Sequence, residues 1–352
     1  MSLSRTSPAS ARRGDEPLLS VRDLSVTFGI KNQTPFTAVD GLSFDVHPGQ
    51  TIGLVGESGC GKSVTSLAIM GLLPTRGNRV SGTATYDGQD LLSLSDKEMG
   101  AKRGKDISMI FQDPLSSLNP VVPIGRQVTE VLERHRGMSK KEAMPHARDM
   151  LNKVGIPDPD RRLKDYPHQL SGGMRQRALI AMALACEPRL LIADEPTTAL
   201  DVTIQAQILA LLRELVEDTG TALIMITHDL GVVAGLCDEI NVLYGGRLVE
   251  RAERHDLFAE PRHPYTGGLL ASVPSLEGER GGRLTPVPGS VSDNLPWTSA
   301  CAFAPRCSSA TEHCREETPD LSVSAGGRAL RCFNPLAGDP SPAESATTQE
   351  VR

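Results

Sequence analysis

The stretch GESGCGKS, residues 56–63, decides the fold. It follows the apolar run TIGLV and opens the run KSVTSLAIMGLL, so it joins a predicted strand to a predicted helix. Its G-x-x-x-x-G-K-S spacing is that of a P-loop, whose glycines let successive backbone N–H groups point at a phosphate. The N-terminus of the following helix adds a favourable dipole for the same anion. The stretch therefore predicts a nucleotide site at a strand-to-helix turn.

The residues of this loop form the predicted ATP-binding set. Lys62 is expected to reach the β- and γ-phosphates, and the Ser63 hydroxyl to ligate Mg²⁺. Cys60 is interpreted as incidental, because such a loop binds through its backbone. The complete set is Gly56, Glu57, Ser58, Gly59, Cys60, Gly61, Lys62, Ser63 and Val64.

A second run, LLIADEP at residues 190–196, places two carboxylates at the end of an apolar strand. Asp194 is expected to hold Mg²⁺, directly or through water, and Glu195 to polarise the attacking water as a general base. A strand ending in two acids is weak evidence alone, since strand ends often carry solvated acids. Together with the P-loop upstream it indicates nucleotide hydrolysis.

Short β-type runs alternate with helical stretches along the chain, which predicts an α/β fold with a largely parallel core sheet. The runs include residues 18–28, 51–56, 107–112, 190–196, 222–229 and 240–250. Residues 1–16 and 337–352 are polar, rich in Pro, Ser and Ala, and lack periodicity, so both are predicted to be disordered. After about residue 275 the composition shifts to Gly and Pro, which marks a small irregular C-terminal module.

Composition limits the kinds of partner, compartment and cysteine chemistry expected of this protein. Apolar residues make up 39% of the 352 residues, enough for a substantial core, and the net charge of −6 argues against a nucleic-acid partner. No apolar run approaches the ~18 residues that cross a bilayer, and the N-terminal stretch lacks the apolar segment of a signal peptide. The chain is therefore expected in the cytosol unless a partner holds it at a membrane. In that compartment seven cysteines indicate thiols or metal ligands rather than disulfides.

Further motifs resemble those of ABC-type ATPases. LSGGMRQR at 170–177 is similar to the signature that distinguishes this family from other P-loop proteins. The other elements follow in the expected order: Gln112 matches the Q-loop, TTALD ending at Asp201 matches the D-loop, and His228 matches the switch histidine. Phe28 lies where the family carries the aromatic residue that stacks on adenine. The resemblance covers about residues 20–250.

The resemblance implies an architecture and a mechanism. ABC ATPases pair head to tail, so the signature residues would contact a γ-phosphate bound by the partner. Gln112 would join Mg²⁺ together with Ser63 and Asp194, while His228 would help to hold Glu195 and the water. The implied nucleotide-binding domain spans 17–270, with an antiparallel β subdomain and a helical subdomain at about 113–168. The signature residues acting in trans are Ser171, Gly172, Gly173 and Met174.

Two features resemble the oligopeptide/dipeptide importer subfamily in particular: HPYTGGLLASVP from His263, and the cysteine cluster that follows. This implies the motor subunit of a peptide importer at the cytoplasmic membrane face. Its partners would be two permease subunits, a second, related ATPase chain and an extracytoplasmic substrate-binding protein. Related importers of nickel, heme or other small solutes remain open. A soluble ABC ATPase acting on DNA or ribosomes is disfavoured, because the chain has one cassette and no sustained heptads. An exporter is disfavoured because exporters commonly fuse cassette and membrane domain.

Four cysteines lie in the C-terminal module, predicted at 271–336, with spacings C-x5-C-x6-C-x17-C. Structural zinc sites usually contain a tight Cys-x2–4-Cys pair, which is missing here, and four thiolates suit a [4Fe–4S] cluster equally well by ligand count. The spacing alone leaves Zn²⁺, an iron–sulfur cluster and unligated thiols open. The resemblance to peptide-importer ATPases favours a [4Fe–4S] cluster with a structural role. Its expected ligands are Cys301, Cys307, Cys314 and Cys332.

Overall fold

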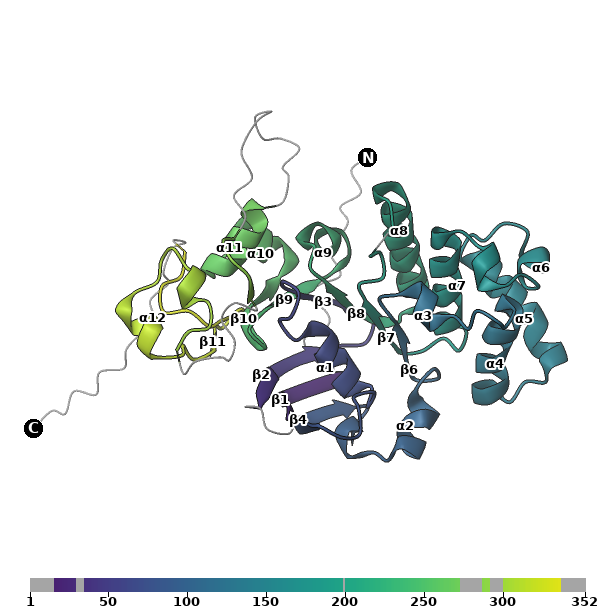
Figure 1. Cartoon of the computed structure of the whole chain (residues 1–352), viewed down its shortest axis with the longest axis horizontal. Helices are drawn as coiled ribbons and strands as arrows, with labels where there is room; N and C mark the ends of the chain where they lie inside the picture. The colour runs from purple at the N-terminus through teal and green to yellow at the C-terminus, as the bar shows by residue number, and fades with distance from the viewer. Residues whose placement is uncertain (1–15, 30–34, 199, 273–286, 292–299, 337–352) are drawn as a thin grey trace, which may run out of the picture.

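The computed structural model describes residues 16–29, 35–198, 200–272, 287–291 and 300–336. The two ends predicted to be disordered lie outside these ranges, apart from Glu16. The described strands form an eight-stranded sheet in the order β11-β12-β10-β9-β3-β8-β7-β6 and a four-stranded sheet in the order β2-β1-β4-β5. Figure 1 shows the larger sheet running through the molecule, with the smaller one beside it.

Five neighbouring strands of the larger sheet are parallel. Every residue of β3, β7 and β8 is buried, which is the continuous apolar pattern expected of strands covered on both faces. The carboxyl ends of parallel strands meet at one edge of a sheet, so the residues that follow them are brought together. The five strands are β3 (Thr51–Val55), β6 (Ile107–Ile110), β7 (Leu190–Asp194), β8 (Ala222–Thr227) and β9 (Glu239–Tyr244).

The sheet as a whole is mixed, so the prediction of a largely parallel sheet is wrong at one edge. The run 240–250 is a hairpin rather than one strand: β9 turns at Gly245 and Gly246 into β10 (Arg247–Glu253), which pairs with β9 antiparallel. Both glycines have positive φ, 58° and 77°, which suits this tight reversal. The C-terminal strands β12 (Ala329–Leu330) and β11 (Ser322–Val323) extend the same antiparallel edge.

The smaller sheet is antiparallel throughout, as the resemblance implied. It packs with α1 and the 3-10 turn η2 around a second hydrophobic core, which includes Leu19, Val21, Phe44 and Ile69, all buried. Its elements and their neighbours are β1 (Leu19–Phe28), β2 (Phe36–Val46), α1 (Lys62–Ile69), β4 (Asn78–Tyr86), β5 (Gln89–Asp90), η2 (Leu91–Ser93) and α2 (Asp96–Lys102).

Short helices between β6 and β7 form a helical block at one end of the molecule (Figure 1). Ser139 begins α5 with a reciprocal capping box to Glu142, which fixes the start of that helix. The longer helices of the block pack on one another, and its extent as a subdomain at 113–168 remains a prediction. Its elements are α3 (Pro114–Ser117), α4 (Ile124–Arg136), α5 (Lys140–Lys153), α6 (Pro159–Arg162), η3 (Pro167–Gln169) and α7 (Gly172–Leu184).

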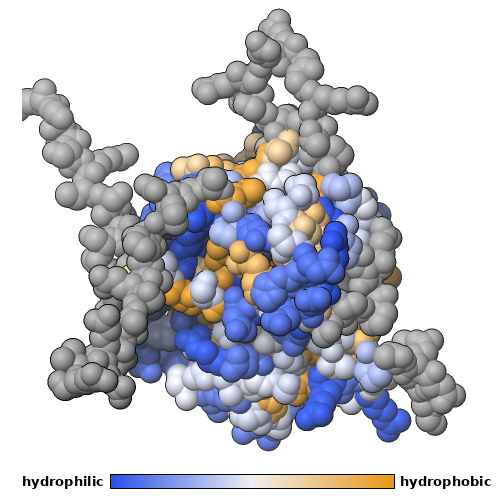
Figure 2. Space-filling view, turned by 90° about the vertical axis from the view of Figure 1, so that its left-hand side faces the viewer, coloured by the Kyte–Doolittle hydropathy of each residue, from blue (hydrophilic) through white to orange (hydrophobic). Residues whose placement is uncertain are grey.

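The C-terminal segment lies at the opposite end (Figure 1), and Figure 2 shows hydrophilic and hydrophobic residues interspersed on this side. It is anchored by Glu250 of β10, which is fully buried and accepts hydrogen bonds from the backbone of Arg262 and His263 and from the side chain of Arg328. Among the described residues, no helix is both long and apolar enough to cross a bilayer. The remaining helices are α8 (Val202–Thr219), α9 (Leu230–Leu236), α10 (Arg254–Ala259), α11 (Pro264–Ala271), η5 (Ala304–Arg306) and α12 (Glu312–Glu316).

Candidate nucleotide-binding and hydrolysis site

The predicted P-loop joins β3, in the centre of the larger sheet, to α1. Gly61 precedes the helix with φ +97°, and a Cβ there would collide with the carbonyl oxygen of Ala38, so the position requires glycine. The Lys62 ammonium is buried and donates to the carbonyl oxygens of Gly56 at 2.6 Å and Glu57 at 3.0 Å. The loop is thus closed around its lysine.

Ser63 and Asp194 meet beside this loop. The Ser63 hydroxyl donates to Asp194 Oδ1 at 3.0 Å, although the two residues lie 131 positions apart in the sequence. Asp194 is 5% exposed, and this burial raises the pKa of its carboxyl, against the lowering effect of the Ser63 hydrogen bond. An adjacent hydroxyl and buried carboxylate are the oxygen ligands that Mg²⁺ takes in nucleotide sites. The pair therefore fits a divalent cation.

Glu195 accepts three hydrogen bonds from side chains in different parts of the chain. Gln112 donates to its Oε2 at 3.1 Å and Thr198 to the same oxygen at 2.8 Å, while His228 Nδ1 lies 3.2 Å from Oε1. Burial alone would raise the pKa of Glu195, but the hydrogen bonds from Thr198 and His228 outweigh it, so the pKa is lowered. The carboxylate is therefore ionised at neutral pH, as a general base must be. Sequence reasoning missed Thr198.

The signature and D-loop residues lie at helix N-termini. Ser171 caps α7, its Oγ accepting the Met174 N–H at 3.3 Å, and Asp201 caps α8 by accepting the Ile204 N–H at 3.0 Å. Ser171 and the following Gly172 are exposed. The α7 N-terminus therefore faces solvent, where it is free to meet an anion on another molecule. Its action in trans, and the D-loop role of Asp201, remain predictions.

Phe28 is the last residue of β1 and pairs in register with Phe36 and Asn78. It is partly buried against the second core. Its stacking on adenine remains a prediction.

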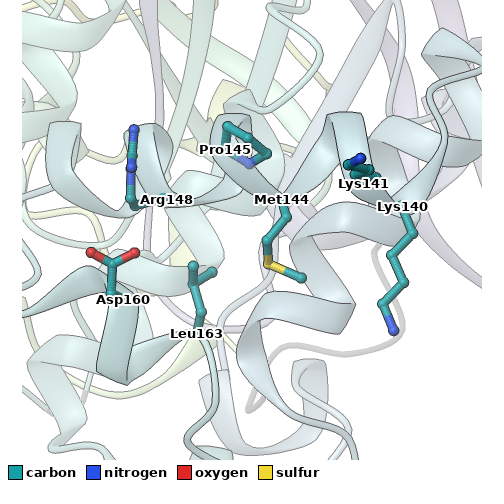
Figure 3. Close-up of a pocket in the computed structure, with 7 residues that line it drawn as sticks. All are labelled: Lys140, Lys141, Met144, Pro145, Arg148, Asp160 and Leu163. Atoms are coloured by element: carbon teal, nitrogen blue, oxygen red, sulfur yellow. The ribbon is translucent and has the colours of Figure 1, made fainter.

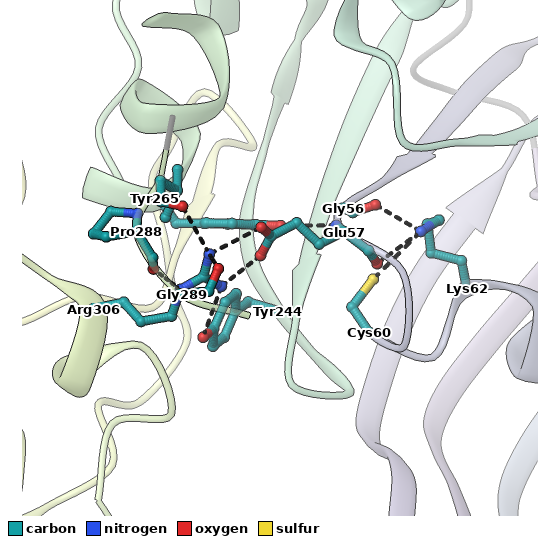
Figure 4. Close-up of polar contacts among 10 residues, drawn as sticks. Gly56, Glu57, Cys60, Lys62, Tyr244, Tyr265, Pro288, Gly289 and Arg306 are labelled. Carbon is teal, nitrogen blue, oxygen red and sulfur yellow. Dashed lines mark hydrogen bonds and ion pairs between the residues drawn. The ribbon is translucent and has the colours of Figure 1, made fainter. Parts of the chain in front are cut away.

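The other side of the P-loop is held by the C-terminal segment, which sequence reasoning did not foresee (Figure 4). The Arg306 guanidinium contacts both oxygens of the Glu57 carboxylate, at 2.5 and 2.9 Å. The Glu57 backbone N–H donates to the Tyr265 hydroxyl at 2.8 Å. Tyr265 belongs to the HPYT stretch and Arg306 lies between two of the four clustered cysteines. Two stretches read only as subfamily markers therefore converge on one loop residue.

A groove of about 620 Å³ lies elsewhere, on the helical block (Figure 3). It is open to solvent and contains none of the predicted site residues. Cationic, acidic and apolar side chains line it together. Its lining residues are Lys140, Lys141, Met144, Pro145, Arg148, Asp160 and Leu163.

The structure does not show the predicted metal centre. Within the described ranges, which include all four clustered cysteines, no group of three or more His, Cys, Asp or Glu side chains is arranged to hold a metal ion. The Cys314 sulfur has polar neighbours instead: Asn334 Nδ2 lies 3.3 Å away and Thr311 Oγ1 3.4 Å away. The small irregular segment is present, whereas its metal remains a prediction.

Comparison with known proteins identifies the class. A family model for ABC transporters matches residues 39–198, and one for the C-terminal region of oligopeptide/dipeptide transporters matches 249–314. The solved dimeric MJ0796 ATP-binding cassette with ADP and Pi covers 67% of this chain and 98% of its own, at 28% identity and a TM-score of 0.60. The cbiO1 subunit from Clostridium perfringens covers 70% and 92%, at 28% identity and a TM-score of 0.58. The fold is that of an ABC transporter ATPase.

Relatives narrow the class further. The oligopeptide transport ATP-binding protein OppD of Salmonella typhimurium is 50% identical over 336 residues, 96% of this chain and 99% of OppD. The dipeptide transport ATP-binding protein DppD of Bacillus subtilis is 52% identical over 319 residues, 90% of this chain and 95% of DppD. The chain belongs to the ATP-binding subunits of oligopeptide/dipeptide ABC transporters.

Proposed function

We propose that this chain is the ATP-hydrolysing motor subunit of an importer of dipeptides or oligopeptides. Family membership over nearly the whole chain supports the substrate class. The observation that carries the catalytic role is the Glu195 carboxylate, which is ionised and held by Gln112, Thr198 and His228 at the end of β7, next to Asp194. ATP hydrolysis on this chain then drives import through separate membrane subunits.

The residues divide the work of hydrolysis. Lys62 and the loop N–H groups bind the triphosphate, and Ser63, Gln112 and Asp194 would hold the Mg²⁺ ion that neutralises its charge. Glu195 accepts a proton from the attacking water. Hydrogen bonding keeps its carboxylate ionised, and therefore able to accept that proton, and fixes its direction. His228 and Thr198 hold that carboxylate in place.

The site is completed by a second ATPase. Ser171, Gly172, Gly173 and Met174 present a capped helix N-terminus to the γ-phosphate bound by the partner, and Asp201 lies at the adjoining helix start. The exposure of Ser171 and Gly172 supports this arrangement. Phe28 stacks on the adenine.

The partner ATPase is a related but different chain, and the pair docks on two permease subunits at the cytoplasmic face of the membrane. A substrate-binding protein delivers the peptide from outside.

The four clustered cysteines hold a [4Fe–4S] cluster, with Zn²⁺ as the alternative. The support comes from the sequence: four cysteines at C-x5-C-x6-C-x17-C spacing supply the ligand count of a [4Fe–4S] cluster. When bound, the cluster would staple a segment with little regular structure of its own. The ligands of the cluster are Cys301, Cys307, Cys314 and Cys332.

The Glu195→Gln variant tests the proposed hydrolysis. The amide keeps the shape of the side chain but cannot accept the proton, so turnover should fall by at least about a hundredfold, within the range general bases contribute. ATP binding should survive, trapping the nucleotide and the closed dimer. The measurements are steady-state phosphate release and retention of radiolabelled ATP by the paired ATPases. Hydrolysis near the wild-type rate would remove Glu195 from this role.

A further inference from the structure

The Arg306 guanidinium makes several hydrogen bonds in addition to its ion pair with Glu57. Besides the two bonds to the carboxylate, the guanidinium donates from Nε to the Pro288 carbonyl at 2.6 Å and from Nη2 to the Gly289 carbonyl at 3.0 Å. Its Nη1 lies 3.3 Å from the Tyr244 hydroxyl. Its side chain is 4% exposed, whereas that of Glu57 is 29% exposed. A planar guanidinium with this many fixed acceptors is held rigidly, unlike a surface salt bridge.

Packing behind this contact links it to the core sheet. The rings of Tyr244, Tyr265 and Phe303 contact one another, with centroids 4.8 to 5.3 Å apart. Tyr244 ends β9, the parallel neighbour of the P-loop strand, while Phe303 belongs to the cysteine segment. The aromatic cluster therefore fixes the cysteine segment against the strand that flanks the P-loop, and Arg306 extends from it to the loop.

We propose that Arg306 is a positioning residue for nucleotide binding, through which the cysteine segment holds the P-loop in its phosphate-binding shape. The proposal rests on the proposed function, because it takes the P-loop as the ATP site. It adds a residue outside the nucleotide-binding motifs. Arg306 acts in two ways: it fixes the loop at Glu57, and it neutralises a carboxylate that belongs to the loop itself.

The charge of Glu57 predicts that loss of Arg306 weakens ATP binding. Without Arg306, Glu57 is left as a partly buried and unpaired carboxylate in the phosphate-binding loop. An unpaired negative charge there disfavours a polyanion, and the loop also loses its two-point attachment. ATP binding should weaken about tenfold, a change that corresponds to about 1.4 kcal/mol. The rate of turnover at saturating ATP should stay within about twofold, because Arg306 contacts none of the hydrolysis residues.

A double-mutant cycle tests this with the full-length chain. Binding of a fluorescent ATP analogue is measured for wild type, Arg306→Ala, Glu57→Gln and the double variant, and KM and kcat are measured for the assembled ATPase. Because Glu57→Gln removes the unpaired charge, Arg306→Ala should weaken binding by no more than about threefold in that background, a sign of coupling. Arg315→Ala is the matched control, since Arg315 lies in the same segment but its side chain is 61% exposed.

Each outcome decides the proposal. A large loss in the wild-type background that shrinks beside Glu57→Gln supports it. Equal losses in both backgrounds, wild-type affinity in Arg306→Ala, or a matching loss in Arg315→Ala would overturn it. If Arg306→Ala does not fold, the same cycle is run with Arg306→Lys, which keeps the charge but not the two-point contact. Failure of the wild-type chain to bind ATP would instead refute the proposed function.

Discussion

Glu195 is held in a conformation that its residue type disfavours. Its φ is +45°, in the left-handed region that costs a non-glycine residue free energy. The backbone N–H donates to the Ile226 carbonyl of the neighbouring strand at 2.9 Å, and three side chains fix the carboxylate. These contacts hold the strained backbone in place and fix the carboxylate in one position. This is the arrangement expected where a proton must be accepted from a water in a defined position.

The buried imidazole of His263 makes the stability of the fold depend on pH. It begins α11, is 2% exposed, and its Nδ1 accepts the Tyr265 N–H at 3.0 Å. Burial lowers its pKa from 6.5 to about 4, although the nearby Glu250 opposes this shift. Above pH 6.5 the imidazole is neutral in folded and unfolded chains. As the pH falls from 6.5 towards 4, the unfolded chain binds more protons, so the folded state is progressively destabilised.

We therefore expect His263→Asn to reduce the acid sensitivity of the fold. Asparagine retains an acceptor for the helix start but does not titrate. The stability lost between pH 7 and pH 5 should be smaller than in wild type by about 2 kcal/mol. Urea unfolding at the two pH values measures this difference. His255→Asn is the control, because His255 is exposed. An unchanged pH dependence in His263→Asn would contradict the expectation.

Site residues that directly follow parallel strands can be predicted from the sequence. A contact between segments that no repeat or strand order connects cannot. Gln112, Glu195 and His228 each follow a parallel strand, so strand order alone brings them to one edge, and the structure joins them by hydrogen bonds. Arg306 could not be found in this way. Its partner lies 249 residues earlier, and no spacing rule connects a cysteine-rich segment with a P-loop.

At the scale of elements, two helices begin with the same serine cap, but only one of these caps is proposed to act in nucleotide binding as well as in stability. Ser171 and Ser139 both cap a helix by accepting the N–H three residues on, from Met174 and Glu142. Ser139 lies in the helical block, whereas Ser171 begins the signature helix. A hydroxyl that caps a helix contributes about 1 kcal/mol. Only the Ser171 hydroxyl is also proposed to contact a nucleotide.

This contrast predicts different results for two equivalent changes. Ser171→Ala and Ser139→Ala should each lower stability by about 1 kcal/mol, since each removes one cap. Ser171→Ala should also reduce ATPase activity of the assembled pair at least about tenfold, the scale of one lost charge-assisted hydrogen bond. Ser139→Ala should leave activity within about twofold. Thermal unfolding and phosphate release measure the two effects. Equal activities would show that Ser171 only caps its helix.

Strand order also explains the error in the predicted sheet. Parallel strands require crossover helices, which the sequence signals by alternating patterns. The antiparallel edge arises from the hairpin between β9 and β10 and from β11 and β12, which are two residues each. Segments this short carry no periodicity. Contacts of Arg328 with Glu250 and of Arg331 with the Leu248 carbonyl hold them against β10 instead.

At the scale of the whole molecule, the metal content of the cysteine segment can be measured directly. Chain purified anaerobically should contain about four irons and about four sulfides, as a [4Fe–4S] cluster requires. Cys314→Ser should lose them. Cys186→Ser is the control, because this buried cysteine lies outside the segment, against the helical block. Stoichiometric zinc without iron would favour the alternative metal, and a chain free of metal would remove the centre altogether.

The ion pair between Glu57 and Arg306 has a consequence for the order in which the molecule is made. The partners are separated by 249 residues, so this loop closure comes late in synthesis and contributes to a high contact order. A nascent chain that has emerged as far as His228 contains every nucleotide-binding motif but lacks the arginine that anchors its first loop. A fragment cut after the motifs should therefore resemble an unfinished translation product: complete in its signatures, incomplete in the support for its P-loop.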